Sequence, residues 1–195
     1  MNDPEFPEDD HDFASHSGDG GGEESAGPAR PIPVELHSFY EDRPFRSCTR
    51  CGEALEFFEE GYRVSKIHRE SEVLFEYALC LPCLKNLYEE SSEESRERLM
   101  RFQMERYREV SGFEECVFCD TWRPGEGRAE YGLIGICLGL DLLESNLVCG
   151  GCMEAMSALV SEQTRKSWDR FVEENFPGVP AGFEPMPIRG PVSLV

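Results

Sequence analysis

The chain has 195 residues, enough for one ordinary domain or two small ones. Its 39 acidic and 19 basic residues give a formal net charge of −20, which repels phosphate groups, so general binding to nucleic acids or anionic membranes is not expected. No apolar run reaches the roughly 18–20 residues that span a bilayer, and the acidic start lacks the features of a secretory signal. We expect a soluble protein of the cytoplasm, where paired cysteines more often bind metal than form disulfides.

Residues 1–33 form an acidic stretch rich in Gly, Ser and Pro, with nine acidic residues and one basic residue. Such a segment cannot bury enough apolar surface to offset its ordering entropy, so it predicts a disordered acidic arm. The arm would serve as a solubilising tail or bind a partner. At the other end, residues 179–195 are Pro-rich and predict an extended tail.

Residues 34–112 form the first predicted module. It contains, in order, a Cys-x-x-Cys turn, two β-rich stretches typical of a hairpin, a second Cys-x-x-Cys and two helical segments. These are Cys48–Cys51, 62–68 and 73–79, Cys80–Cys83, 84–88, and 92–107. Ser92 followed by acidic residues predicts a capped start for the last helix.

Residues 113–178 form the second predicted module, because the chain overlays itself when Cys48 is placed on Cys116 and Tyr62 on Tyr131. The cysteine pairs recur as Cys116–Cys119 and Cys149–Cys152. The agreement continues into the last helix, where Ser92, Glu93, Arg96, Arg101, Phe102 and Glu105 meet Ser161, Glu162, Arg165, Arg170, Phe171 and Glu174. A repeat that extends this far favours two duplicated modules, each with its own ion, rather than one interleaved site.

Four thiolates at one point favour zinc or an iron–sulfur centre. A site closed by four protein ligands is the structural arrangement, so we predict two structural Zn²⁺ ions per chain. The predicted ligands are Cys48, Cys51, Cys80 and Cys83 for one ion and Cys116, Cys119, Cys149 and Cys152 for the other. The order of knuckle, hairpin and helix resembles the treble-clef family of zinc modules. The predicted fold class is therefore α+β, with two tandem small zinc modules behind an acidic arm.

The cysteine spacing from Cys48 to Cys152 also resembles that of the papillomavirus early transforming protein family. The step from Cys83 through Leu84 and Lys85 into a helix fits as well. The resemblance implies a protein without enzymatic activity, whose two zinc modules and linking helix form a groove for leucine-rich helical motifs. The chain departs from that family in its strong negative charge and its acidic arm.

The two hairpins differ in polarity. The first carries Arg63, Lys66, His68 and Arg69, whereas the stretch from 131 to 140 is apolar on both faces, as in strands covered on both sides. Burial against the first module is one interpretation, and an exposed patch for a partner is the other. The candidate partner-binding residues are Tyr131, Leu133, Ile134, Ile136 and Leu138.

The function favoured by these patterns is that of a non-enzymatic, zinc-stabilised protein for protein–protein interaction or regulation. One alternative is a nucleic-acid-associated zinc protein that uses a basic patch on the first hairpin, formed by Arg46, Arg50, Arg63, Lys66 and Arg69. A thiol-redox protein is the other alternative. No phosphate loop, nucleophile elbow or His-Glu metal motif is present, and the ninth cysteine, Cys137, lies in an apolar stretch that predicts a buried thiol.

Overall fold

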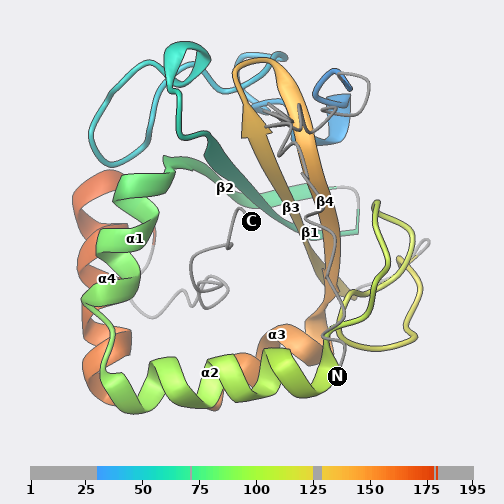
Figure 1. Ribbon diagram of the computed structural model, residues 1–195, viewed down its shortest axis with the longest axis vertical. Coiled ribbons are helices and arrows are strands. Elements are labelled where there is room, and N and C mark those ends of the chain that lie inside the picture. Colours follow the sequence, from blue (N-terminus) through green and yellow to red (C-terminus); the bar gives the residue numbers. More distant parts are fainter. Residues whose placement is uncertain (1–29, 71, 125–128, 178, 180–195) are drawn as a thin grey trace, which may run out of the picture.

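The computed structural model describes residues 30–70, 72–124, 129–177 and 179. The fold is α+β, as expected, with an antiparallel sheet on one side and helices along two others (Figure 1). The first repeat contributes β1 (Tyr62–Arg69), β2 (Glu72–Cys80), α1 (Leu81–Glu89) and α2 (Glu93–Arg106). The second contributes β3 (Glu130–Leu138), β4 (Asp141–Cys149), α3 (Gly150–Ser157) and α4 (Glu162–Asn175). Two short 3₁₀ helices precede them, η1 (Val34–Leu36) and η2 (Leu55–Phe57).

The two predicted hairpins join into one sheet. Its strand order is β2-β1-β3-β4, all antiparallel. The central strands β1 and β3 pair along their whole length, from Tyr62 opposite Cys137 to Arg69 opposite Glu130. The repeats at 34–112 and 113–178 therefore share a sheet and one buried core cluster.

The two repeats are related by an approximate two-fold axis through the middle of this sheet. Ser65 pairs with Ile134, its own counterpart in the second repeat, and such self-matched contacts lie on a two-fold axis. Each hairpin also has a register shift at equivalent places, at Ile67/His68 and at Ile136/Cys137. The symmetry of the sequence is thus a symmetry of the structure.

The same axis passes between the amino-terminal ends of α2 and α4. Ser92 and Ser161 cap these helices, and their side chains accept from the backbone N–H groups of Ser95 and Thr164. The two capping hydroxyls lie 2.8 Å apart. The backbone N–H of each capping serine in turn donates across the axis, to Thr164 at 3.0 Å and to Ser95 at 2.8 Å. The predicted cap at Ser92 is therefore also a contact between the repeats.

Each of the two long helices packs on the opposite repeat. From α4, Trp168 and Phe171 contact Tyr77 of β2 at ring-centroid distances of 6.0 and 5.9 Å. The α4 residue Ser167 donates to the carbonyl of Glu90, the residue after α1, at 3.3 Å, and Figure 1 shows α4 beside α1. The repeats therefore exchange helices, and each needs the other to complete its core.

The α2 helix makes the reciprocal contact. Its buried residue Phe102 packs edge-to-face on Phe118, between the first two cysteines of the second repeat, at a ring-centroid distance of 5.5 Å. A helix that follows the first repeat thus supports the metal-ligand turn of the second repeat.

The folded part of the chain includes residues that the sequence placed in the acidic arm. Arg30 accepts a backbone hydrogen bond from Leu142 at 2.7 Å and donates from its guanidinium to the carbonyl of Leu143 at 2.8 Å. Ile32 is buried in the core. Residues 30–33 therefore belong to the fold, because an apolar side chain and backbone hydrogen bonds attach them to β4. The rest of the predicted arm, 1–29, and residues 180–195 of the predicted tail lie outside the described residues.

Leu36 of η1 is fully buried and covers the sheet at Gly135. A Cβ atom at position 135 would lie 2.2 Å from a methyl carbon of Leu36. The glycine in the otherwise bulky strand β3 therefore allows this close packing.

Candidate metal centres

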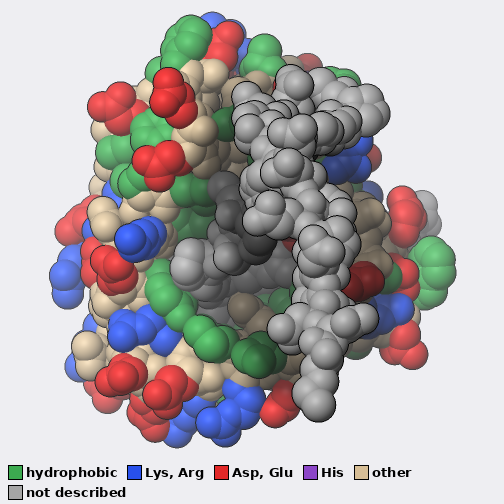
Figure 2. Space-filling model, viewed as in Figure 1, with side chains coloured by type: hydrophobic (Ala, Val, Ile, Leu, Met, Phe, Trp, Pro, Cys, Tyr) green, Lys and Arg blue, Asp and Glu red, His purple; other side chains and the backbone are tan. Residues whose placement is uncertain are grey.

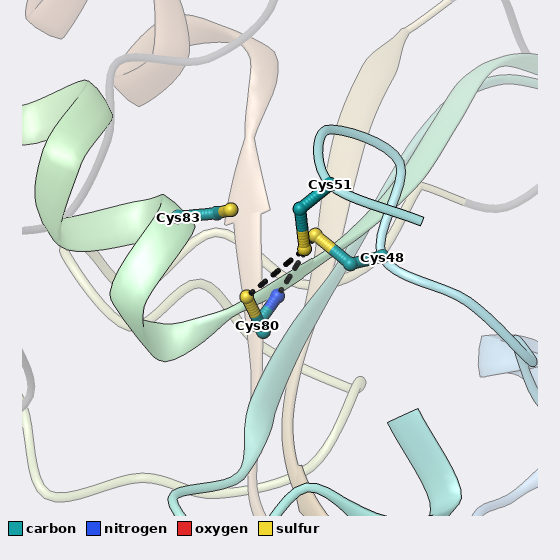
Figure 3. A group of neighbouring side chains, drawn as sticks. All are labelled: Cys48, Cys51, Cys80 and Cys83. Carbon is teal, nitrogen blue, oxygen red and sulfur yellow. Dashed lines mark hydrogen bonds between the residues drawn. The ribbon is translucent and has the colours of Figure 1, made fainter. Parts of the chain in front are cut away.

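The first four-cysteine cluster gathers at one edge of the sheet. Figure 3 shows the four sulfur atoms pointing toward one another from three elements: the turn before η2, the end of β2 and the first turn of α1. The four sulfur atoms all lie within 4.8 Å of one another. Its members are Cys48, Cys51, Cys80 and Cys83.

Backbone hydrogen bonds fix the turn that supplies the first two thiols. The N–H of Cys48 donates to the carbonyl of Glu53 at 2.8 Å, and that of Gly52 donates to the carbonyl of Cys48 at 2.9 Å. Gly52 has φ +76°, a conformation that glycine adopts without steric cost. The N–H of Thr49 donates to Ala78 of β2 at 2.8 Å. The turn is therefore docked beside the strand that delivers Cys80.

The second cluster repeats this construction at the opposite edge, where β4 meets α3. The N–H of Cys116 donates to Thr121, and that of Val117 donates to Leu147 of β4, both at 2.8 Å. These bonds are the counterparts of those made by Cys48 and Thr49. The four thiols, again within 4.8 Å of one another, belong to Cys116, Cys119, Cys149 and Cys152.

The spacing of the sulfur atoms fits a tetrahedral ion. Zinc–sulfur bonds of about 2.3 Å in a tetrahedron place neighbouring sulfur atoms about 3.8 Å apart. The Sγ atoms of Cys51 and Cys80 are 3.8 Å apart, and those of Cys119 and Cys149 are 3.6 Å apart. Each cluster could therefore hold one metal ion, and all eight predicted ligands fall into the two predicted groups.

Hydrogen bonds to sulfur favour the thiolate form at some of these positions. Burial works against ionisation of Cys48, but the backbone N–H groups of Cys51 and Cys80 outweigh it and lower the pKa of its thiol. The N–H of Cys80 donates to the Cys48 Sγ at 3.4 Å, and the equivalent bond runs from Cys149 to Cys116, also at 3.4 Å. For Cys119, hydrogen bonds with Thr121 overcome the opposing effect of burial and lower the pKa to about 7.

Other thiols of the clusters hold their protons more tightly. Burial and the neighbouring thiols raise the pKa of Cys80 to about 11 and raise those of Cys83 and Cys152 further. Four charges cannot accumulate in so small a volume without a cation. A divalent ion would supply that compensation and displace the protons, so metal binding at these sites should be strongly pH-dependent.

Arg108, which follows α2, holds the second cluster from outside. Its guanidinium donates to the carbonyls of Cys116 at 3.1 Å and Cys119 at 2.5 Å, and it forms an ion pair with Glu115 at 3.1 Å. Such outer contacts orient metal ligands. Nothing in the cysteine pattern indicated this residue.

The expected partner surface on the second hairpin needs correction. Tyr131, Leu133, Ile134 and Ile136 are buried, and only Leu138, at the end of β3, is exposed. β3 is an inner strand with β1 on one side and β4 on the other, and its faces are covered within the chain. Of the two interpretations of this apolar stretch, burial against the first repeat is the one that the structure shows.

The basic patch proposed for nucleic acids loses four of its five members, and Arg46 alone stays exposed and outside the ion pairs of the described residues. Arg63 and Lys66 are buried, while Arg50 and Arg69 form ion pairs with Glu90 and Glu130. On the face shown in Figure 2, Lys and Arg side chains are interspersed with Asp and Glu over the helices. The first hairpin therefore lacks the free positive surface that phosphate binding requires.

The ninth cysteine is a buried thiol, as expected. Cys137 is fully buried opposite Tyr62, and burial raises its pKa to about 12. A protonated, inaccessible thiol is unreactive.

The pattern of the sequence did not reveal a buried ion pair on the first hairpin. Lys66 and Glu76 lie opposite each other on β1 and β2, with their charged atoms 3.1 Å apart and both side chains more than nine-tenths buried. The carboxylate of Glu76 also accepts from the Ser38 hydroxyl at 3.1 Å and from the Phe39 backbone N–H at 2.8 Å. The pair fixes the loop after η1 to the sheet. The signal for this ion pair in the sequence was the presence of opposite charges, Lys66 and Glu76, in two adjacent predicted strands.

No family model, curated protein or solved structure matches this chain. The similarity to the papillomavirus proteins therefore remains one of cysteine spacing. Among the described residues, no helix is both long enough and apolar enough to cross a membrane. The fold and the two clusters define an α+β protein with a pair of four-cysteine sites.

Proposed function

We propose that this protein is a non-enzymatic, zinc-stabilised interaction protein with two structural Zn²⁺ ions. The observation that carries the proposal is the closure of both clusters, in which four sulfur atoms surround one point. Four-thiolate sites leave no position for a substrate or an activated water, which is the arrangement of structural zinc. The many reduced thiols suit a reducing compartment such as the cytoplasm.

The clusters hold the strands and helices together at both edges of the sheet. Cys80 and Cys149 end the two edge strands, and Cys83 and Cys152 lie in the first turns of α1 and α3. An ion at each place would tie a loop, a strand and a helix to one another. In a small domain, such a tie contributes stability that the apolar core alone supplies only in part.

The loop fixed by Glu76 offers a contact surface. Phe39 and Tyr40 are 68% and 87% exposed, and their rings pack edge-to-face at a centroid distance of 5.8 Å. The Ser38 side chain and the Phe39 N–H are held by the Glu76 carboxylate, with Lys66 behind it. Exposed aromatic residues on a rigid support are typical anchors of protein interfaces. We assign this aromatic pair, Phe39 and Tyr40, as the partner contact.

Metal analysis tests the zinc part of the proposal. Protein purified without added metal should contain two zinc ions per chain by elemental mass spectrometry. Removal of zinc by a strong chelator should abolish the thermal transition, since a structural site contributes about 10–16 kcal/mol of apparent binding free energy. One ion per chain, iron in place of zinc, or an unchanged transition after removal would contradict it.

Substitution tests the interaction part separately. Phe39→Ser together with Tyr40→Ser should preserve zinc content and melting temperature while removing binding to a partner isolated with the wild-type protein. Phe57→Ser is a matched control, because Phe57 is an exposed aromatic residue, at 79%, at the end of η2. If the double variant still binds the partner as the wild type does, Phe39 and Tyr40 are not the contact.

A further inference from the structure

Buried polar atoms without a partner gather on one face of the sheet. Six such side-chain atoms occur in the described part of the chain. Four of them lie on or against the face of the sheet that Tyr77 shares with α4, and they belong to Arg63, Ser65, Asn146 and Trp168. Buried polar groups are nearly always hydrogen-bonded, so such a concentration calls for a physical explanation.

Arg63 is the most costly of these groups to leave unpaired. Its side chain is 2% exposed, and its single hydrogen bond in the described structure goes to the Tyr77 hydroxyl at 3.1 Å. Its Nε–H has no acceptor, and no described carboxylate lies within ion-pair distance. Removing a guanidinium from water without an anion costs several kcal/mol. The missing group is therefore a negatively charged acceptor.

The neighbours of Arg63 also offer unpaired donors. Ser65 follows two positions along β1, on the same face and opposite Tyr77, and its hydroxyl is buried without a partner. Trp168, whose ring lies 6.0 Å from that of Tyr77, has an unpaired indole N–H. Three donors from β1 and α4 thus surround one tyrosine. A carboxylate, with two oxygen atoms and about four acceptor positions, matches this set.

Asn146 adds an acceptor farther along the same row of the sheet. It lies on β4 in register with Ser65, with Ile134 between them. Its amide nitrogen donates to Glu144 at 2.6 Å, and its carbonyl oxygen is buried without a donor. Two strand spacings separate Ser65 from Asn146 by about 10 Å. An extended ligand with a carboxylate at one end and an N–H at the other would satisfy both positions.

We propose that Arg63, Ser65 and Trp168 form a binding site for the carboxylate of a peptide segment, with Asn146 accepting an N–H of the same segment. The site is specific to one half of the molecule, because the repeat counterparts of Arg63, Ser65 and Trp168 are Gly132, Ile134 and Leu99. It is independent of the aromatic pair proposed above as the partner contact.

The carboxylate has two possible sources with the same chemistry. One is an acidic peptide of another molecule. The other is Glu184, the single acidic side chain in the sequence between 180 and 195. Val179, the last described residue, packs against the core near Phe176. The ring of Phe176 lies tilted against that of Phe75, on the same sheet face, at a ring-centroid distance of 4.4 Å. Five residues span at most about 17 Å, which sets the distance from Val179 over which Glu184 can be tested as the source of the carboxylate.

Nuclear magnetic resonance of the full-length, zinc-loaded chain tests the site. The readouts are the Nε–H signal of Arg63 and the indole N–H signal of Trp168. The indole signal of Trp122, whose side chain is 67% exposed, is an internal control. The variants are Glu184→Gln and Arg63→Met, and the probe is the peptide acetyl-Ala-Glu-Ala-amide, with its Gln analogue for comparison.

If the Arg63 and Trp168 signals shift in Glu184→Gln, the Trp122 signal does not, and the Glu peptide restores the wild-type positions, then the site binds the chain's own carboxylate. Signals that are unchanged in Glu184→Gln but shifted by the Glu peptide, and not by the Gln peptide, support the site with an external source. Two outcomes overturn the proposal. In one, neither change moves the signals, and water satisfies the donors. In the other, the Trp168 response persists in Arg63→Met, so that Arg63 does not receive the carboxylate.

Discussion

The exchange of helices between the repeats predicts that damage to a helix of one repeat loosens the metal cluster of the other. Phe102 on α2 is the clearest case, because its ring packs on Phe118, which lies between Cys116 and Cys119. The Phe102→Ala substitution removes a side chain that is 9% exposed. Truncation of a buried phenylalanine costs about 3–5 kcal/mol, and we take the lower value for a site at the margin of the core.

The expected effect is a change in the local accessibility of the thiols. If the whole loss falls on local opening of the second cluster, about 3 kcal/mol corresponds to an opening about 100-fold more frequent, at about 1.4 kcal/mol per factor of ten. Alkylation of metal-loaded protein with N-ethylmaleimide, followed by mass spectrometry of the peptides, measures each cysteine separately. Cys116 and Cys119 should react up to about 100-fold faster, whereas Cys48 and Cys51 should change much less.

Two controls sharpen the comparison. Met104→Ala lies on the same helix but alters a side chain that is 79% exposed, so it should leave all rates unchanged. Phe171→Ala on α4 should have the opposite preference and speed the reaction of Cys80 and Cys83, because Phe171 packs on Tyr77 of β2. Faster reaction of the first cluster alone in Phe102→Ala would refute the exchanged packing. An equal rise for all eight cysteines would refute local opening.

Three further substitutions, one of them with an exposed control, test individual contacts by denaturant unfolding. Burial, with Lys66 and Arg123 nearby, lowers the pKa of His68 from 6.5 to about 4. As the pH falls from 6.5 to 4, the unfolded chain binds a proton at this residue before the folded chain does, so the free energy of unfolding decreases by up to about 3 kcal/mol. His68→Phe should flatten this decline. Lys66→Met should cost about 3–5 kcal/mol by leaving a buried carboxylate unpaired. Lys166→Met removes one partner of a fully exposed ion pair and should leave the free energy of unfolding nearly unchanged; equal costs for the two substitutions would contradict the burial of Lys66. Gly135→Ala should destabilise by about 1–3 kcal/mol, because its methyl group would overlap a buried leucine; an unchanged midpoint would show that η1 moves freely.

Much of the local structure could be predicted from short-range patterns. Cysteine pairs separated by two positions mark tight turns, and alternating apolar residues between 62 and 79 mark two strands, because these signals depend on neighbours in the chain. The internal repeat places Cys48 on Cys116 and Cys80 on Cys149. Because each copy of a duplicated unit forms the same contacts within itself, the repeat assigned the eight cysteines to two sets of four ligands. The cap at Ser92 could be predicted from neighbours as well, because a helix start depends on a few adjacent residues.

The sequence by itself therefore determined the α+β class, the two hairpins and the membership of the two cysteine clusters. Only the tertiary structure decided that β1 pairs with β3, that α2 and α4 exchange places, and that the polar first hairpin is buried. The reason is that an apolar strand such as β3 must be covered, but its composition does not specify by what. From the sequence alone, Arg63 and Lys66 are expected at the surface, because charged side chains are mostly exposed in folded proteins. The partner strand, the helix above them and Glu76, which make their burial possible, come together only in the folded chain.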